Sequence, residues 1–345
     1  MTRRAITRWL TYLVAVASHY SGVDRLYRAF AGGGLVVLML HRVRDEPDPY
    51  PLSITPASLR QLVGWIRREG SLTSLDDGLR SLHEPRGAGT AYALTFDDGY
   101  RDNLRLTEAD LAGVPALVYL ATGHVGGDPI WAYRLIHAIV ARRHDQLNAA
   151  ELGVGQFDLA DPLDRQRAYE LLPARLKQLS PTELEDWMER IGQQLQPARP
   201  APERREMLDW NDVRKLASRG IGIGGHTRGH VMLSQVDEKT AREEIRGSCE
   251  HIRRELGSAP RHFAYPNGTS EDFGDRDARL VREAGFASAA TTIEGVNRFG
   301  TDPYRLRRYN VYEHRYRSPS GRLSKALFMS DTSGLLSWFK TRMRA

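Results

Sequence analysis

Short apolar runs alternate with amphipathic stretches along most of the chain. Continuous apolar runs bounded by turn residues predict buried strands at residues 35–40, 91–96, 116–120, 221–223, 263–265 and 287–291. Apolar positions spaced three and four residues apart predict helices at residues 56–69, 210–218, 239–256 and 275–284. Strands that alternate with helices favour a parallel α/β sheet or barrel.

Residues 130–206 break this alternation. The stretch is mostly helical and charged in pattern, and it ends in a proline-rich segment at residues 196–202. We interpret it as an insertion packed over one rim of the α/β core. Residues 319–345 form the tail, in which Leu335, Leu336, Trp338, Phe339 and Met343 stand beside Lys340, Arg342 and Arg344. This mixture predicts a basic amphipathic tail.

The first 31 residues have a helical apolar pattern of their own. Apolar residues recur at three- and four-residue steps from Trp9 to Phe30, flanked by Arg8, Arg25 and Arg28. We predict a basic amphipathic helix that lies on an anionic membrane surface, because its apolar run is too short to span a bilayer. Two other interpretations stay open: a signal peptide cleaved near residues 15–17, and a helix docked on the domain.

Composition narrows the possible chemistry. The chain has 345 residues, 49 basic and 43 acidic, for a net charge of +6, and a single cysteine, Cys249. One cysteine excludes an internal disulfide framework and a multi-thiolate metal site, so a metal site must use His, Asp and Glu. The mild positive charge permits contact with an anionic membrane, and we find no nucleic-acid-binding motif.

Two short motifs follow predicted strands and carry candidate chemistry. Asp97 and Asp98 follow the strand at 91–96, and His226 and His230 follow the strand at 221–223. Alone, the acidic pair also fits a helix-capping turn, and the histidine pair is a weak signal. Together, one Asp and two His form a three-ligand set with open positions, typical of a catalytic divalent metal. The second Asp is then free to act as a base toward water.

At these motifs the sequence resembles the polysaccharide deacetylase family, whose first motif is Thr-Phe-Asp-Asp-Gly (95–99 here) and whose second is His-Ser/Thr-x-x-His (226–230 here). The resemblance implies a distorted (β/α) barrel of parallel strands over residues 32–318. It also implies that Asp97 is the general base, and that Asp98, His226 and His230 hold one divalent metal, which we expect to be zinc.

The third family motif, Arg-Pro-Pro-Tyr-Gly, departs from the pattern at residues 264–268. The family arginine, which pairs with the base, is replaced by Ala264, and Arg261 is the nearby candidate to replace it. The resemblance places an oxyanion and substrate group at Tyr265, Pro266 and Asn267, where a backbone N–H donor can survive the change of side chain.

The family's general acid is a histidine in a Leu-x-His motif, usually near the C-terminus. Here the matching residues are Leu38-Met39-Leu40-His41, directly after the first predicted strand. A closed barrel lets the first strand occupy the place of the last, so we predict His41 as the acid and keep His314 as the alternative.

These features predict a hydrolase of a linear amide, namely a metal-dependent N-deacetylase acting on an N-acetylated amino sugar of a cell-envelope or lipid-linked glycan. We expect it to lie peripherally on the bacterial inner membrane, on either the cytoplasmic or the periplasmic face. Three alternatives stay open: a related amidohydrolase of a non-sugar amide, a non-haem iron oxygenase, and a non-catalytic glycan-binding protein.

Overall fold

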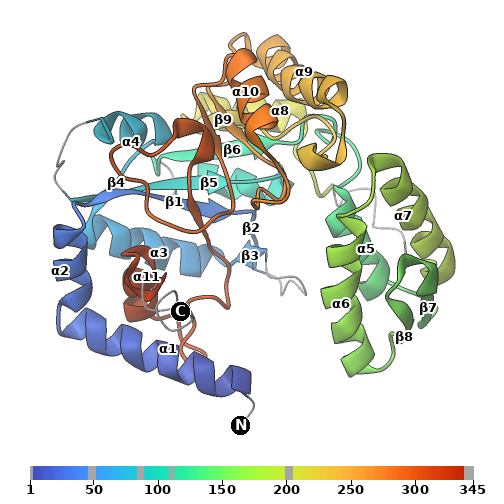
Figure 1. Ribbon diagram of the computed structural model, residues 1–345, viewed down its shortest axis with the longest axis horizontal. Helices are drawn as coiled ribbons and strands as arrows, with labels where there is room; N and C mark the ends of the chain where they lie inside the picture. The colour runs from blue at the N-terminus through green and yellow to red at the C-terminus, as the bar shows by residue number, and fades with distance from the viewer. Residues whose placement is uncertain are drawn as a thin grey trace.

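A parallel β-sheet forms the centre of the molecule (Figure 1). The structure is a computed structural model that describes residues 3–45, 52–83, 89–108, 111, 113–198 and 205–337, with only the backbone of 3–6. The strand order is β11-β10-β9-β6-β5-β1-β12, with β4 paired to β5. These strands are β1 Gly34–Leu40, β4 Ser71–Leu72, β5 Thr90–Phe96, β6 Ala116–Leu120, β9 Gly222–Gly225, β10 His262–Ala264, β11 Ser288–Ala290 and β12 Arg308–Asn310.

The sheet curls until its two ends nearly meet. β1 pairs in parallel with both β5 and β12, so the first and last strands in chain order are neighbours, and the ends of the sheet are β11 and β12. Just before β12, Leu306 forms a parallel bridge to Ala290 of β11. The expected distorted barrel of parallel strands is therefore confirmed, and the six strands predicted from the sequence lie in it.

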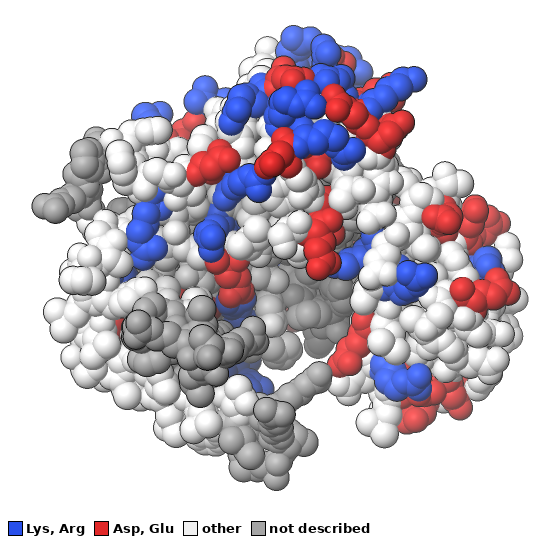
Figure 2. All heavy atoms as spheres, viewed as in Figure 1, with Lys and Arg blue, Asp and Glu red and all other residues white. Residues whose placement is uncertain are grey.

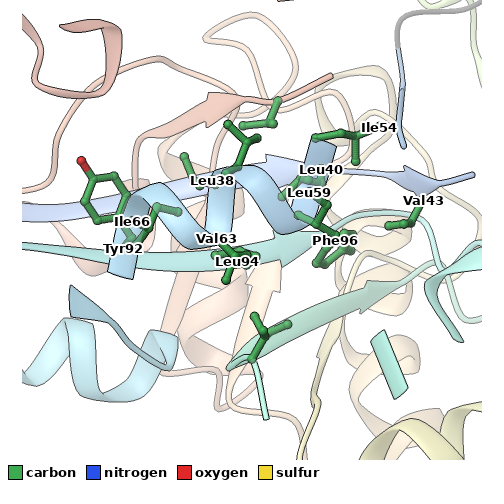
Figure 3. Packing of buried hydrophobic residues seen from close by; sticks show 14 of the residues in the cluster. Leu38, Leu40, Val43, Ile54, Leu59, Val63, Ile66, Tyr92, Leu94 and Phe96 are labelled. Atoms are coloured by element: carbon green, nitrogen blue, oxygen red, sulfur yellow. The ribbon is translucent and has the colours of Figure 1, made fainter. Parts of the chain in front are cut away.

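Helices cover the outside of this barrel. α3, Pro56–Glu69, begins at Thr55, whose side chain caps the N–H of Ser58, and it places Val63 and Ile66 against Leu38 of β1 and Leu94 of β5 (Figure 3). The period of three and four thus buries one face of the helix against the sheet. The remaining helices around the barrel are α4 Leu75–Ser81, α8 Trp210–Ser218, α9 Glu238–Leu256 and α10 Asp275–Glu283.

Short elements complete the connections. The parallel pair β2 Arg42–Val43 and β3 Ser53–Ile54 extends the chain beyond β1. The 3₁₀ turns are η1 Arg101–Thr107, η2 Ala150–Leu152, η3 Leu233–Gln235 and η4 Pro303–Arg305.

The segment expected to be an insertion builds a small hydrophobic cluster of its own, with Leu135, Leu172 and Ile191 among its buried residues. Its elements are α5 Trp131–Val140, β7 Gln146–Ala149, β8 Gly155–Asp158, α6 Pro162–Leu176 and α7 Pro181–Leu195. The antiparallel hairpin β7–β8 was not predicted, because four-residue strands with exposed polar positions leave too short a pattern to recognise.

The N-terminal region forms two helices rather than one. α1, Arg3–Tyr20, and α2, Val23–Phe30, are separated at Gly22, whose φ of 80° is easy for glycine and interrupts the helix. α1 runs along the lower edge of the molecule in Figure 1, beside α11, Lys325–Thr332. In the described part of the chain, no helix has the length and apolar character needed to cross a membrane.

The structure describes only the first part of the predicted basic amphipathic tail, residues 319–337. α11 is buried, and Leu335 and Leu336 after it are 3% and 4% exposed. Leu336 and Phe328 of α11 belong to the main hydrophobic core, which also includes Ala15 of α1. The rest of the predicted pattern, Trp338, Phe339, Lys340, Arg342, Met343 and Arg344, lies outside the described residues.

Candidate active site

The carboxyl ends of the parallel strands converge on one mouth of the barrel. Backbone hydrogen bonds set its registry: the N–H of Asp97 donates to the carbonyl of Leu40 at 2.9 Å, and the N–H of His226 donates to the carbonyl of Leu120 at 2.9 Å. Asp97 is thereby held beside Leu40, the residue before His41. The chain thus brings the first strand, the acidic pair and the histidine motif to the same edge of the sheet.

Asp98, His226 and His230 form a buried cluster suited to a metal ion. Asp98 Oδ1 lies 3.4 Å from His226 Nε2 and 3.3 Å from His230 Nε2. One ligand atom from each of the three residues lies within 4.8 Å of the others, and all three are buried. The predicted trio is therefore assembled as expected, and its N and O donors fit one divalent ion.

The hydrogen bonding of His226 supports this use. Its Nδ1 donates to the carbonyl of Ala264 at 2.7 Å, which leaves the Nε2 lone pair directed at the cluster. Metal-binding histidines commonly donate their other ring N–H in this way. Burial raises the pKa of Asp98, but the neighbouring imidazoles of His226 and His230 outweigh it, so that this pKa lies well below its ordinary value and the carboxylate is ionised.

Strained backbone concentrates at this mouth. Five non-glycine residues in the described part of the chain have a left-handed φ, and four lie in the loops of the site: Asp98 at 78°, Thr227 at 59°, His230 at 54° and Asn267 at 55°. Such conformations cost about 1–3 kcal/mol each and persist only where the surroundings impose them. The loop conformations therefore cost stability, and they place the side chains of the site in fixed positions.

One of those restraints comes from α9. A single carboxylate oxygen of Glu244, Oε2, accepts hydrogen bonds from the N–H groups of Arg228 and Gly229 at 2.8 and 2.7 Å. These two residues lie between His226 and His230, so Glu244 fixes the loop that spaces the two histidines. This role was not predictable from the sequence, because acidic residues are common on surface helices and nothing in the local pattern distinguishes Glu244.

Asp97 is held by an arginine that sequence reasoning did not identify. Arg308 of β12 is fully buried, and its Nη1 and Nη2 donate to Asp97 Oδ1 and Oδ2, each at 2.7 Å. The same guanidinium donates to Thr95 Oγ1 at 3.1 Å and to the carbonyl of Thr291 at 2.7 Å. The arginine missing at Ala264 is thus replaced from another strand.

Arg261 does not have the compensating role considered for it. Its Nε donates to Asp76 Oδ1 at 2.8 Å, and its side chain is 66% exposed. It precedes β10, at the end of the strand opposite the mouth, and so cannot reach Asp97. Arg308 becomes recognisable only once barrel closure places β12 beside β1.

Electrostatics keep Asp97 ionised in this buried place. Burial raises the pKa of Asp97, but the charge of Arg308, followed by those of His226 and His41, outweighs it, and the pKa lies below its ordinary value. The carboxylate is therefore available as a proton acceptor at neutral pH.

His41 is at the predicted end of β1, at the edge of the same mouth. Asn103 Nδ2 donates to the His41 carbonyl at 2.8 Å, and the His41 Nδ1 is buried without a partner among the described residues. His314 is exposed in the turn after β12. The placement brings His41 to the acidic pair, and it leaves His314 on the surface.

The next residue, Arg42, ties this strand end to the proposed insertion. Its buried guanidinium donates to Asp102 at 2.8 Å and to Glu206 at 2.5 Å, and it lies over the rings of Tyr100 and Tyr133. Tyr133 belongs to α5, so this contact holds α5 beside the strand end that carries His41.

The three residues predicted as the oxyanion and substrate group are not equivalent. The Tyr265 ring stacks on Phe273 with centroids 4.0 Å apart, and its hydroxyl donates to the carbonyl of Tyr304 at 3.1 Å. Its side chain is thus buried in the packing outside the barrel. Pro266 is buried, and Asn267 takes the tight turn, with a buried Nδ2 that lacks a partner among the described residues.

Asn310 is a further polar residue of the mouth that the sequence did not single out. On β12, Arg308 points inward to Asp97 and Tyr309 packs in the outer core, so the two-residue alternation turns Asn310 inward again. Its Oδ1 is buried without a partner among the described residues. It lies one layer closer to the mouth than Arg308.

Fold and site together define a class: a nearly closed parallel barrel with a buried Asp-His-His centre and a separate carboxylate beside it. The family model described as polysaccharide deacetylase matches residues 182–289, which include His226 and His230. This match confirms the resemblance that the motifs indicated, and with it a hydrolase that acts on amides. A search of curated proteins gave no match.

Solved structures show the same fold. A Streptococcus pyogenes deacetylase, PplD, in complex with acetate has a TM-score of 0.53 at 16% identity, over 84% of this chain and 96% of that one. IcaB from Ammonifex degensii has a TM-score of 0.53 at 18% identity, over 88% of this chain and 97% of that one. At these identities the similarity establishes the fold alone.

Proposed function

We propose that the protein is a metal-dependent N-deacetylase that removes acetyl from an N-acetylated amino sugar of a cell-envelope or lipid-linked glycan. The observation that carries the proposal is the pairing of Asp97 with Arg308 beside the Asp98-His226-His230 cluster. A buried carboxylate held at both oxygens, next to three ligands with open positions, suits hydrolysis. The similar PplD structure, which contains acetate, supports the same reaction class.

Asp98, His226 and His230 would hold the metal, and we propose zinc because these N and O donors match its preferred ligands. When bound, such an ion supplies a Lewis acid that polarises a carbonyl and makes water nucleophilic at neutral pH. The remaining chemistry belongs to side chains and backbone of this chain.

Asp97 accepts the proton of the attacking water, and Arg308 fixes the direction of its two oxygens. His41, at the end of the neighbouring strand β1, donates a proton to the nitrogen of the leaving amine. The amine is a poor leaving group until it is protonated, so both proton transfers are needed. The backbone at Asn267 contributes a donor to the developing oxyanion.

Acetate release tests this proposal. Purified protein, stripped of metal and then restored with zinc, is offered N-acetylglucosamine oligomers, a lipid-linked N-acetylated sugar and a simple non-sugar acetamide. We expect acetate from an N-acetylated sugar only after metal is restored, and none from His226→Ala, which should also lose metal by elemental analysis. Cleavage of the non-sugar amide alone would replace the proposal with the related amidohydrolase.

A further inference from the structure

The N-terminal helices present their apolar side to solvent. The positions in α1 that share one face by their three- and four-residue spacing are Trp9, Leu10, Leu13 and Val14, which are 45%, 57%, 54% and 40% exposed. The exposed apolar side chains continue to Tyr20 and onto α2 at Val23, Leu26 and Phe30. In an ordinary surface helix this stripe would face the core.

We call these eight side chains the N-terminal apolar face. Its most exposed members are on or next to α2: Phe30 is 94%, Tyr20 78% and Leu26 70% exposed. Scattered single apolar residues are normal on a protein surface, but eight on two consecutive helices are a concentration that marks an interaction site.

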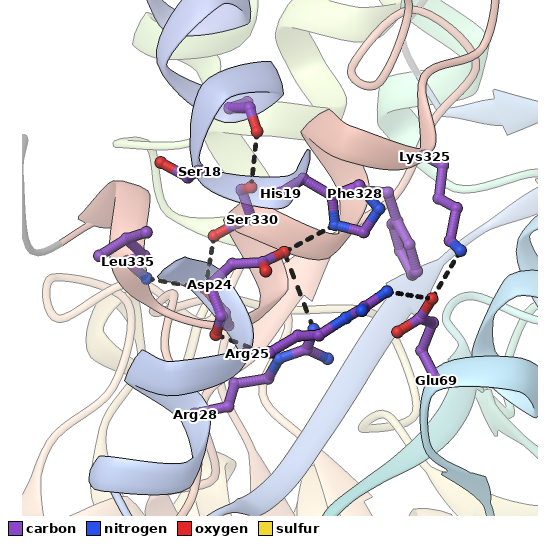
Figure 4. Close-up of polar contacts among 12 residues, drawn as sticks. Ser18, His19, Asp24, Arg25, Arg28, Glu69, Lys325, Phe328, Ser330 and Leu335 are labelled. Atoms are coloured by element: carbon purple, nitrogen blue, oxygen red, sulfur yellow. Dashed lines mark hydrogen bonds and ion pairs between the residues drawn. The ribbon is translucent and has the colours of Figure 1, made fainter. Parts of the chain in front are cut away.

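The opposite side of the same helices is small and polar, and it makes the internal contacts (Figure 4). His19 donates to Asp24 at 2.8 Å, and both residues are buried. The hydroxyl of Ser330 in α11 donates to the carbonyl of Ala15 at 3.1 Å. These contacts fix the rotation of α1 about its axis, and the apolar side is left outward.

A second set of polar contacts holds α2. Arg25 and Lys325 both donate to Glu69 of α3, at 3.1 and 2.6 Å, and Arg28 lies 3.8 Å from Asp24. The orientation is thus determined by specific partners on α3, α11 and α1 itself. The apolar side faces outward because these polar contacts hold the two helices in this orientation.

Charge indicates what covers this face. Residues 3–30 contain five arginines and one acidic residue, Asp24, which is fully buried. Among the described side chains of the two helices, Arg8 and Arg25 are exposed, whereas Arg28 is buried beside Asp24, so the exposed charge is positive. Figure 2 shows charged side chains of both signs crowded over α9 and α10, whereas the flank where α2 lies is mostly uncharged.

We propose that the N-terminal apolar face docks on the surface of an anionic lipid bilayer. Leu10, Leu13 and Leu26 would enter the boundary between headgroups and acyl chains, and arginines such as Arg8 and Arg25 would meet anionic headgroups. A second copy of the chain fits less well, because it would bring arginines against arginines. This surface is separate from the barrel mouth, and its binding does not depend on the proposed reaction.

Flotation with lipid vesicles tests the proposal on the full-length protein. Wild type should float with vesicles of equal parts phosphatidylcholine and phosphatidylglycerol, and bind weakly to phosphatidylcholine alone. The variant Leu10→Ser/Leu13→Ser changes two side chains that are more than half exposed, so its fold should be kept. We expect its vesicle partitioning to fall at least about tenfold.

Leu163→Ser provides the matched control, because Leu163 is 73% exposed but lies in α6, away from this face. It should bind vesicles as wild type does. Equal binding by the double variant and wild type would overturn the proposal, as would equal binding to the two vesicle types. A wild-type dimer that the double substitution dissociates, with no vesicle binding, would assign the face to a second copy and also overturn it. Flotation is read without turnover, so a lack of deacetylase activity would leave this result standing.

Discussion

The barrel mouth and the N-terminal helix pair both reverse the usual distribution of side chains, but in opposite senses. The mouth buries charge: Asp97, Asp98 and Arg308 are 3%, 2% and 0% exposed. The helix pair exposes apolar groups, with Phe30 at 94% and Leu26 at 70%. Each arrangement costs stability, so each points to a use other than folding.

The two regions differ in where that cost is offset. At the mouth, Arg308 neutralises Asp97 within the molecule, and His226 and His230 contact Asp98. On the N-terminal apolar face, no group in the described part of the chain covers the exposed side chains, and we propose that a lipid surface does so. We interpret the internally paired charges as the proposed reaction centre and the exposed apolar face as the proposed docking surface. The predictions below test the first half of this comparison, and vesicle flotation tests the second.

Outside the acidic pair, the largest effect is expected at His41. His41→Ala should keep the fold and the metal but lose about 10²–10⁴-fold in amide hydrolysis, the usual contribution of a general acid. It should lose less with an activated aryl acetate, because that leaving group departs without the proton. Rates on the two substrates separate acid function from general damage, which would slow both equally.

His314→Ala is the control for His41. His314 is exposed in a turn, so its variant should hydrolyse the amide as wild type does. A near wild-type rate for His41→Ala together with a slow His314→Ala would show that the acid is at the other end of the barrel.

Removing Arg308 should affect both stability and pH dependence. Arg308→Met leaves a buried carboxylate without its partner, which typically costs about 3–5 kcal/mol in the free energy of unfolding. The wild-type pKa of Asp97 lies below its ordinary value, so this pair stabilises the fold above about pH 4 and the stabilisation is lost as the pH falls through the folded-state pKa.

In Arg308→Met, burial acts on Asp97 without Arg308 to oppose it, so the pKa of Asp97 should rise. Because the base works only when ionised, the acidic limb of kcat/KM should move to higher pH. Arg308→Lys retains a charge and should shift less. An unchanged acidic limb in Arg308→Met would separate this arginine from the base.

Much of the fold was predictable from the sequence, because the strands at 91–96 and 116–120 are buried on both faces and read as continuous apolar runs. The chemical pattern of Asp97, Asp98, His226 and His230 was also recognisable, because each motif directly follows such a strand. The contributions of Arg308 and Asn310 were not recognisable. β12 has only three residues, and the inward-pointing Arg308 interrupts any apolar run. The closure of the sheet places both residues at the mouth, and the local sequence does not encode that closure.

The N-terminal region shows a different limit of prediction from sequence: the pattern predicts a helix but not which side of it faces the core. The apolar period from Trp9 to Phe30 correctly indicated helix, but the same period is typical of a helix that packs inward. Only the contacts of Ala15, His19 and Asp24 establish which side is turned inward.

The smallest effect is expected at Glu244, which anchors the loop between the metal histidines. Glu244→Gln keeps an acceptor but loses the charge that strengthens bonds to two N–H groups. Metal affinity should fall by about tenfold, as is typical for a group that orients metal ligands. Glu243→Gln changes an exposed neighbour on the same helix and should bind metal as wild type does; equal affinities of the two variants would remove Glu244 from this role.

The assignment of different roles to two adjacent aspartates is the central claim, and paired measurement of metal content and acetate release in Asp97→Asn and Asp98→Asn tests it most directly. Asp97→Asn should retain metal at wild-type stoichiometry and lose about 10²–10⁴-fold in rate, since only the proton acceptor is removed. Asp98→Asn should lose metal and activity together. Loss of metal in Asp97→Asn with retention in Asp98→Asn would contradict the account, because the base and the ligand would then be reversed.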